Sequence, residues 1–374
     1  MRAPIVVAAL LACVAIAGLP ASEAGEQGQR AQRFLQRLKR DDKNGDGKVT
    51  REEFTGPQRL FERLDGNRDG AIDRQEATQA VQAAQRRRPG MGQRPLPEGI
   101  EEIRDVVFGK GGGRELKLDI IRPTKRPAGR MPVVVWVHGG AWRGGDKGGR
   151  RTLALAQRGY FTVSIEYRLT HEAIFPAQIQ DCKCAIRWLR AHAREYGIDP
   201  DRIGVWGSSA GGHLVALLGT SGGAGEFEGD GGWPDQSSCV HAVCDFFGPT
   251  DFTRMREGES TMDHDAPDSP ESKLVGGPVQ ESKEACRRAD PITYVTPDDP
   301  PFLICHGEQD RTVPINQSEF LHAALKKAGV DVTFVRVKRG GHGFRGDTDP
   351  SPERIQQRVA EFFDKHLKGI EPKP

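Results

Sequence analysis

Short runs of apolar residues alternate with longer segments of mixed polarity over residues 98–370. Six such runs predict buried β-strands, at residues 131–137, 160–165, 202–206, 243–247, 302–305 and 332–337. Residues 176–196 instead place their apolar side chains at helical spacing, so we expect a helix there that ends at Gly197. Strands that alternate with helices predict an α/β fold, in which helices cover both faces of a mostly parallel central sheet.

The N-terminus carries a different hydrophobic pattern. Arg2 precedes an apolar stretch from Ile5 to Leu19, and small residues follow it at positions 21–24. This order predicts a signal peptide over residues 1–24 and a secreted or periplasmic protein. The stretch is too short for a membrane span and lacks stop-transfer charges. Cys13 lies inside the stretch rather than at its end, which argues against lipidation of that residue.

The rest of the chain divides by composition into three parts. Residues 98–370 are long enough for one α/β domain, and residues 30–85 for a small helical module. Residues 86–97 between them are basic, rich in Pro and Gly, and without periodicity, so we expect a solvated linker. The net charge of the whole chain is only +2 and no nucleic-acid-binding signature is present, so we expect no nucleic-acid partner.

Six cysteines follow the predicted signal peptide. Disulfides are common in exported proteins, but six thiols allow many pairings between which the sequence does not choose. Cys244 and Cys305 lie in predicted core strands, where Cys also serves as a small buried hydrophobe.

The predicted N-terminal module contains two matches to the twelve-residue calcium-binding loop. In each loop, side-chain oxygens occupy positions 1, 3, 5 and 12, a carbonyl occupies position 7, and a glycine occupies the sharp turn at position 6. The ligands expected in the first loop are Asp42, Asn44, Asp46, the Lys48 carbonyl and Glu53. Those expected in the second are Asp65, Asn67, Asp69, the Ala71 carbonyl and Glu76, with Asp73 at position 9.

These loops resemble the small EF-hand modules attached to secreted bacterial enzymes. Hard oxygen ligands at this spacing favour Ca²⁺ over Mg²⁺. Val49 and Ile72 occupy position 8, where paired loops form a short strand contact, and the stripe Phe34-Leu35-Leu38 predicts the first entering helix. We expect a structural calcium role, with protein docking through the module as an alternative.

The second half of the chain contains a G-x-S-x-G sequence from Gly207 to Gly211, directly after the strand predicted at 202–206. This is the context of a nucleophile elbow, in which a strand turns sharply into a helix and exposes the central serine, Ser209. The two glycines relieve crowding at the turn, and the Ala210 N–H lies at a helix N-terminus, where it can stabilise negative charge.

Partners for Ser209 follow other predicted strands. His138-Gly139-Gly140 ends the strand at 131–137, and the N–H groups of Gly139 and Gly140 can complete an oxyanion hole with that of Ala210. Asp310 and His342 follow the strands at 302–305 and 332–337, and we expect them to be the acid and the general base of a catalytic triad. Asp251, after the strand at 243–247, is the alternative acid.

With these motifs the sequence resembles an α/β-hydrolase of the carboxylesterase kind, close to the hormone-sensitive-lipase-like and feruloyl- or acetylxylan-esterase-like branches. The resemblance covers roughly residues 98–370. Many relatives carry an acidic residue where this chain has Ser208, and a third glycine where it has Ala141. Ala141 still supplies a backbone N–H, so these differences concern substrate fit.

The resemblance implies a secreted serine hydrolase of carboxylic esters that needs no cofactor for catalysis. Acetyl or feruloyl groups on polysaccharides are its candidate substrates. Two alternatives stay open: an amide hydrolase, such as a peptidase or formamidase, and a calcium-dependent binding protein whose hydrolase domain is inactive. We expect the Gly-rich stretch 221–235 and the acidic stretch 254–286 to shape the substrate pockets.

Overall fold

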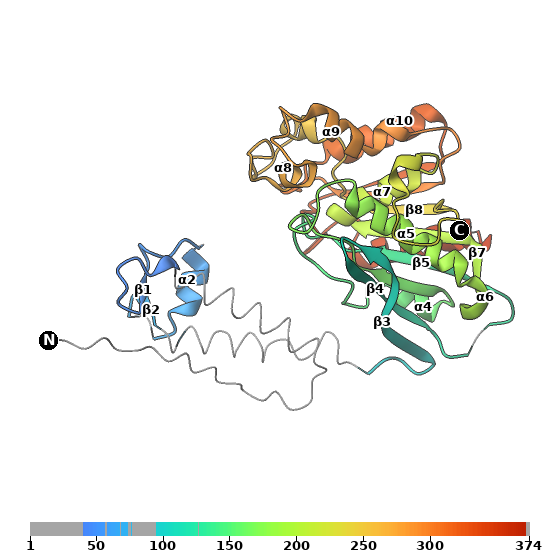
Figure 1. The fold of residues 1–374 in the computed structure, drawn as a ribbon, viewed down its shortest axis with the longest axis horizontal. Coiled ribbons are helices and arrows are strands. Elements are labelled where there is room, and N and C mark those ends of the chain that lie inside the picture. Colours follow the sequence, from blue (N-terminus) through green and yellow to red (C-terminus); the bar gives the residue numbers. More distant parts are fainter. Residues whose placement is uncertain are drawn as a thin grey trace. The chain divides into compact units, whose positions relative to one another are not determined.

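The structure is a computed structural model that describes residues 40–56, 58–67, 69–73, 76, 95–125 and 127–371. It divides the chain into two compact units, Met1–Arg94 and Pro95–Pro374, and the division falls inside the predicted linker 86–97 (Figure 1). The predicted signal peptide, the stripe Phe34-Leu35-Leu38 and most of the linker lie outside the described residues. Among those described, no helix is both long and apolar enough to cross a membrane.

The described part of the first unit consists of β1 (Val49–Thr50), α2 (Gln58–Leu64) and β2 (Ala71–Ile72). β1 and β2 are antiparallel and pair Val49 with Ile72, as predicted. Phe54 and Phe61, whose ring centroids are 5.6 Å apart, pack beneath this pair in a small apolar core. The two calcium-type loops are therefore joined through their strands and share one core.

The second unit is built on an eight-stranded sheet in the order β10-β9-β8-β7-β5-β6-β4-β3. The strands from β5 to β10 pair in parallel, and only β3 and β4 are antiparallel to their neighbours. The mostly parallel sheet is thus confirmed. The strand bounds are β3 (Ile100–Gly111), β4 (Arg114–Pro123), β5 (Met131–Val137), β6 (Phe161–Ile165), β7 (Ile198–Ser208), β8 (Ala242–Phe246), β9 (Phe302–Gly307) and β10 (Val332–Val337).

Helices cover both faces of this sheet. On β5, Val133, Val135 and Val137 face one apolar core with side chains of α5, α7 and α10, while Val134 and Trp136 face a second core with α4 and α11. A strand buried on both faces has no polar positions, which explains its uninterrupted apolar run. The helix bounds are α4 (Leu153–Gln157), α5 (Ala177–Ala191), α6 (Ala193–Tyr196), α7 (Ala210–Thr220), α8 (Pro270–Val275), α9 (Lys283–Ala289), α10 (Asn316–Ala328) and α11 (Pro352–Lys368), with 3-10 turns η1 (Gly225–Phe227), η2 (Phe252–Glu257) and η3 (Pro291–Tyr294).

The helix predicted over 176–196 is interrupted at His192, which separates α5 from α6. It ends where predicted, since Gly197 adopts the left-handed conformation (φ 68°) that closes helices.

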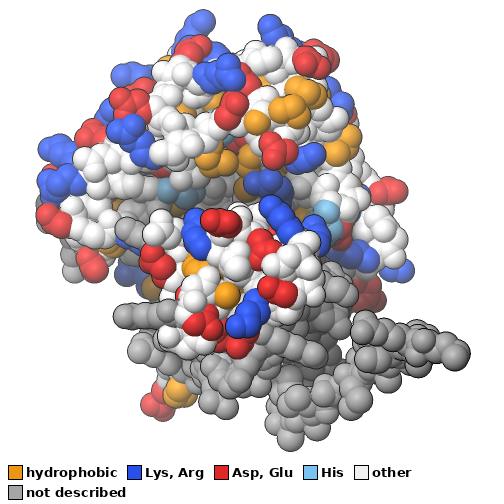
Figure 2. Space-filling view, turned by 90° about the vertical axis from the view of Figure 1, so that its left-hand side faces the viewer, with side chains coloured by type: hydrophobic (Ala, Val, Ile, Leu, Met, Phe, Trp, Pro, Cys, Tyr) orange, Lys and Arg blue, Asp and Glu red, His pale blue; other side chains and the backbone are white. Residues whose placement is uncertain are grey.

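The surface is mixed in charge: on the face drawn in Figure 2, Lys and Arg side chains lie among Asp and Glu side chains.

Candidate active site

Ser209 stands at a sharp turn between β7 and α7. Its backbone adopts φ 55° and ψ −123°, a strained conformation for a residue with a side chain. A Cβ on Gly207 would overlap the Gly211 carbonyl, and a Cβ on Gly211 would overlap the Val137 carbonyl. Both glycines are therefore required by the close approach of the helix to the strands. The strand, turn and helix predicted for a nucleophile elbow are all present.

The loop after β5, residues 138–152, lies against this turn and is called the oxyanion loop below after its predicted role. A Cβ on Gly139 would come within 3.2 Å of the Ser209 Cβ, so the two backbones pack closely. Among the described residues, the N–H groups of Gly139 and Gly140 have no hydrogen-bond partner, and the Ala210 N–H is the first of α7. The three N–H groups predicted for an oxyanion hole are thus available. Ala141 adopts a left-handed φ of 57°, a conformation that the glycine of many relatives would adopt without strain.

Two buried histidines hold the surrounding loops. The Tyr167 hydroxyl donates to the His138 carbonyl (2.9 Å), and the two rings stack at 4.3 Å. His213 lies one turn into α7 and contacts the Ala289 carbonyl through Nε2 (2.7 Å). Burial lowers the pKa of both rings, that of His213 to about 4, so both are neutral near pH 7. Their contacts suit structural anchors of the loops.

His342 and Asp310 are joined by a hydrogen bond of 2.7 Å between Nδ1 and Oδ2. The other carboxylate oxygen of Asp310 accepts from the backbone N–H groups of Thr312 (2.8 Å) and Val313 (3.0 Å). Burial alone would raise the pKa of Asp310, but hydrogen bonds from the His306 and His342 rings outweigh it and hold this pKa well below its usual value. Asp310 is therefore a carboxylate near neutral pH.

The three triad candidates lie at the carboxyl edge of the sheet. Ser209 follows β7, Asp310 follows β9 and His342 follows β10. Phe247, directly after the intervening β8, packs against the His342 ring with the centroids 4.5 Å apart. Between these described residues there is no hydrogen bond from the Ser209 hydroxyl to the His342 ring. Such contacts are often long in enzymes without substrate and shorten when it binds.

Asp251, the alternative acid, makes different contacts. Its Oδ1 accepts from the Thr253 N–H (3.0 Å) and the Thr253 hydroxyl (2.6 Å), so the carboxylate caps η2. Of the two candidate acids, only Asp310 is hydrogen-bonded to His342 among the described residues.

Sequence reasoning missed one buried residue beside the acid. His306, in β9, lies with its Nε2 3.5 Å from Asp310 Oδ2, and both side chains are fully buried. The only signal in the sequence is a histidine that ends an apolar strand, because its other partners come from a later loop and from α10.

The two stretches expected to shape the pockets differ in their contacts. Stretch 221–235 is tied to α5 and β3, for example by Lys183 Nζ to the Ser221 carbonyl (2.8 Å) and by Trp233 Nε1 to the Phe108 carbonyl (2.9 Å). The described atoms of this stretch make no hydrogen bond to the triad candidates or the oxyanion loop, and its role in shaping a pocket stays a prediction.

Stretch 254–286 does border the site. The Thr261 N–H donates to the carbonyl of Arg311 (2.8 Å), next to Asp310, and Arg143 of the oxyanion loop donates to the Asp268 carbonyl (3.3 Å). Figure 1 shows α8 and α9 of this stretch lying side by side. This segment spans from the loop after β9, which carries Asp310, to the oxyanion loop, and can form one wall of the candidate site.

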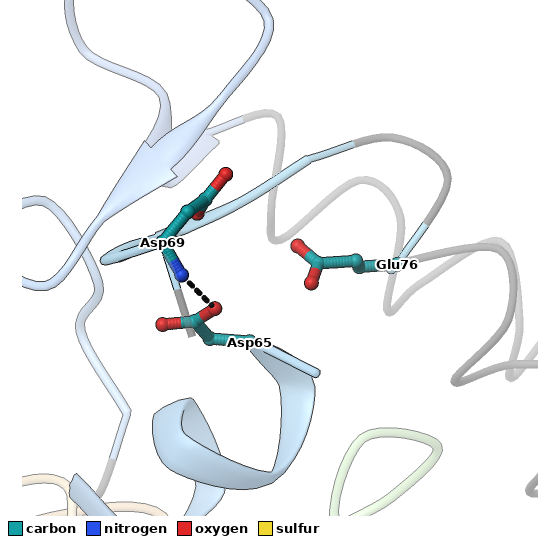
Figure 3. A group of neighbouring side chains, drawn as sticks. All are labelled: Asp65, Asp69 and Glu76. Carbon is teal, nitrogen blue, oxygen red and sulfur yellow. Dashed lines mark hydrogen bonds between the residues drawn. The ribbon is translucent and has the colours of Figure 1, made fainter. Parts of the chain in front are cut away.

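The first unit contains the second candidate site. In its second loop, one oxygen from each of Asp65, Asp69 and Glu76 lies within 4.8 Å of the others (Figure 3). The Asp69 N–H donates to Asp65 Oδ1 (3.1 Å), which closes the loop, and Gly70 adopts the left-handed φ of 88° that the turn at position 6 requires. Asn67 and Ala71 lie between these residues, Asn67 accepting from the Asp69 N–H and Ala71 beginning β2.

The first loop has the same backbone form. Asp42 accepts from the N–H groups of Gly45 (2.8 Å) and Gly47 (3.1 Å), and Glu53 accepts from the Thr50 N–H (3.0 Å). Asn44, Asp46 and Lys48 follow the same turn, since Asp46 accepts from the Lys48 N–H (2.8 Å) and Asn44 from the Asp46 N–H (2.8 Å). The donor sets of both loops consist of oxygens, which suits a calcium ion.

The six cysteines of the described chain are all free thiols. Five are buried and only Cys239 is exposed. Cys244 and Cys305 lie in the core strands β8 and β9, as predicted.

Models of known protein families match both units. The model of the BD-FAE family matches residues 118–325, and that of the EF hand matches residues 39–55 and 58–76. A probable carboxylic ester hydrolase, LipM, of Mycobacterium tuberculosis is 31% identical over 72% of this chain and 63% of its own length. The esterase LipQ of the same organism is 33% identical over 69% of this chain and 61% of its own length. The chain thus spans about three fifths of the length of these curated relatives.

Solved structures agree in fold. A truncated carbohydrate esterase from gut microbiota superimposes with a TM-score of 0.64 and 31% identity, covering 73% of this chain and 99% of its own. Esterase 2 of Thermogutta terrifontis with bound propionate gives a TM-score of 0.59 and 28% identity, covering 76% of this chain and 98% of its own. The chain therefore belongs to the BD-FAE family and has the α/β-hydrolase fold, preceded by an EF-hand segment.

Proposed function

We propose that this protein hydrolyses carboxylic esters with Ser209 as nucleophile, His342 as general base and Asp310 as its acid partner. The observation that carries the proposal is the 2.7 Å hydrogen bond between His342 and Asp310, on the sheet edge where Ser209 occupies an elbow. Because Nδ1 of His342 donates to Asp310, its Nε2 is left without a proton and can accept one.

The reaction then proceeds in two steps that use the same groups. Ser209 Oγ attacks the acyl carbon while His342 Nε2 takes its proton, and the N–H groups of Gly139, Gly140 and Ala210 bind the oxyanion. Each such donor is worth about 3 kcal/mol of transition-state stabilisation. His342 returns the proton to the leaving alcohol, and a water that it deprotonates later cleaves the acyl-enzyme.

For the natural substrate we propose acetyl or aromatic acyl groups on polysaccharides. Two relatives support this class by their descriptions, the carbohydrate esterase from gut microbiota and a bifunctional GH43-CE protein of Bacteroides eggerthii. The pattern of residues 1–24 supports export to the cell exterior or periplasm, where such polymers are found.

We further propose that both EF-hand loops bind calcium. Asp42, Asn44, Asp46, Glu53 and the Lys48 carbonyl would hold one ion, and Asp65, Asn67, Asp69, Glu76 and the Ala71 carbonyl the other. A bound ion would offset the repulsion among the carboxylates of each loop and so stabilise the first unit.

The test compares the wild type with Ser209→Ala on p-nitrophenyl acetate, its amide counterpart and acetylated xylan. We expect ester cleavage by the wild type and a loss of nearly all of it in the variant, with the melting temperature unchanged or higher. Turnover by Ser209→Ala at the wild-type rate would overturn the mechanism. Faster cleavage of the amide than of the ester would favour the amide hydrolase instead.

A further inference from the structure

His306 is fully buried in β9, yet each of its ring nitrogens has a defined partner. Nε2 lies 2.9 Å from the Val313 carbonyl and Nδ1 lies 2.7 Å from the Ser318 hydroxyl. A carbonyl can only accept a hydrogen bond, so the proton of a neutral ring must be on Nε2. Nδ1 then accepts from Ser318, and the tautomer of His306 is fixed by its surroundings.

The same Nε2–H also faces the acid of the proposed triad. It lies 3.5 Å from Asp310 Oδ2, the oxygen that accepts from His342 at 2.7 Å. Two imidazole rings therefore converge on one carboxylate oxygen. The other oxygen, Oδ1, already accepts two backbone N–H groups. The four donors around Asp310 leave its carboxylate little freedom to rotate about its own bond.

We propose that His306 is a positioning residue that orients Oδ2 of Asp310 toward His342, through the Nε2–H that it shares with the Val313 carbonyl. This inference rests on the triad of the proposed function. Donors to its lone pairs stabilise a fully buried carboxylate such as that of Asp310, because an unsatisfied polar atom is costly there. His306 supplies the donor that the backbone of the loop does not.

Groups from every neighbouring element face this pair. Burial raises the pKa of Asp245 of β8 to about 6, and the nearby His306 ring partly opposes this rise. Phe247 presents its ring at 6.2 Å, Ser318 comes from α10, and His342 comes from the loop after β10. Both His306→Asn and His306→Gln remove this influence on Asp245, so the pH profiles of the two variants must be compared with each other as well as with the wild type.

Asn and Gln at position 306 separate the two nitrogens of the ring. The Gln amide can reach the place of Nε2 and keep a donor near Asp310, whereas the shorter Asn amide reaches only the place of Nδ1, near Ser318. We expect His306→Asn to lower kcat about 10- to 100-fold with KM changed less than about twofold, and His306→Gln to stay within about threefold of wild type.

The pH profile adds a readout that a purely structural role would not change. Without the His306 donor, Asp310 is a stronger acceptor for the His342 imidazolium and stabilises this charged form of the ring. The acid limb of kcat/KM should therefore move to higher pH in His306→Asn and stay in place in His306→Gln. His241→Asn is the control, because it also removes an imidazole that is hydrogen-bonded to the backbone. His241 directly precedes β8, at the edge of the sheet opposite to the triad candidates, and its Nδ1 accepts from the Ile203 N–H.

The decisive measurement repeats His306→Asn in an Asp310→Asn background. If His306 acts through Asp310, its substitution should cost little further activity there. An equal loss in both backgrounds, equal impairment by Asn and Gln, or wild-type kcat in His306→Asn would each overturn the proposal. Unchanged activity of Ser209→Ala would instead overturn the proposed function on which it rests, so the two failures are distinguishable.

Discussion

Replacing Asp310 by Asn keeps the shape of the side chain but changes the tautomer of His342 that the site can hold. Two backbone N–H groups, of Thr312 and Val313, point at Oδ1 and require an acceptor there. The Asn carbonyl oxygen must take that place, so its NH₂ group occupies the place of Oδ2. There it faces Nδ1 of His342, to which the carboxylate is now hydrogen-bonded at 2.7 Å. An NH₂ donor selects the tautomer with the proton on Nε2, which cannot accept the proton of Ser209.

The expected loss follows from this inversion. The corresponding substitution in the best-studied serine triad lowers kcat by about 10⁴-fold, equivalent to about 5.5 kcal/mol. We expect a similar loss of p-nitrophenyl acetate turnover here, with KM and the melting temperature close to those of the wild type. The NH₂ group would also face the Nε2–H of His306, donor against donor, so a modest decrease in stability accompanies the loss.

Asp251→Asn serves as the matched control. Among the described residues, the Asp251 carboxylate accepts hydrogen bonds only from Thr253, and an Asn oxygen at this position can still cap η2. We expect less than about a threefold change in turnover. If Asp251→Asn proved more damaging than Asp310→Asn, or if Asp310→Asn kept a tenth of wild-type activity, the acid assignment would be wrong.

Three further predictions concern the rest of the chain. Turnover of small esters should be the same with calcium, with EDTA and after removal of residues 25–95, because the proposed calcium ligands lie in a separate unit. A loss of turnover in EDTA that calcium restores would contradict this expectation. Gly211→Ala should destabilise the protein by about 3 kcal/mol and abolish activity, because its Cβ would overlap the Val137 carbonyl. Gly223→Ala is the control, since Gly223 has open space around it and the substitution should change neither property. Equal melting temperatures of the two variants would refute the packing argument. Burial raises the pKa of Asp290 from 3.8 to about 7, so ionisation of this carboxyl opposes folding. The folded state therefore loses stability as the pH rises between these two values. Asp290→Asn should raise the melting temperature at pH 8 but not at pH 4.

The strands that are buried on both faces could be predicted from the sequence. The expected bounds of 131–137 are those of β5, because a fully buried apolar run leaves few alternatives. The expected bounds of 332–337 are those of β10, although this strand lies at the edge of the sheet and is only partly buried. The hairpin of β3 and β4 was missed, since most of β3 is half-exposed and register shifts break its alternation. Gly112 and Gly113, both with positive φ at the turn, are the signal that could have found it.

Those residues of the candidate site that directly follow β-strands could be predicted from the sequence. Ser209, Asp310 and His342 each follow a strand, so a parallel sheet brings them to one edge whatever the details of packing. The surroundings of Asp310 were not predictable, because His306 meets Ser318 and Val313 only after α10 has packed against β9. Likewise, the contact of stretch 254–286 with Arg311 depends on how a long connection folds back.

The backbone of Ser209 has a consequence for the evolution of this protein. At φ 55° and ψ −123°, a residue with a side chain carries strain of about 1–3 kcal/mol that glycine would not. Ser209 thus makes the fold less stable than it would be with glycine at this position. Without selection for the proposed turnover, replacement of Ser209 by Gly would be favoured by stability alone, and the same scaffold would persist as a more stable protein without a serine at the turn.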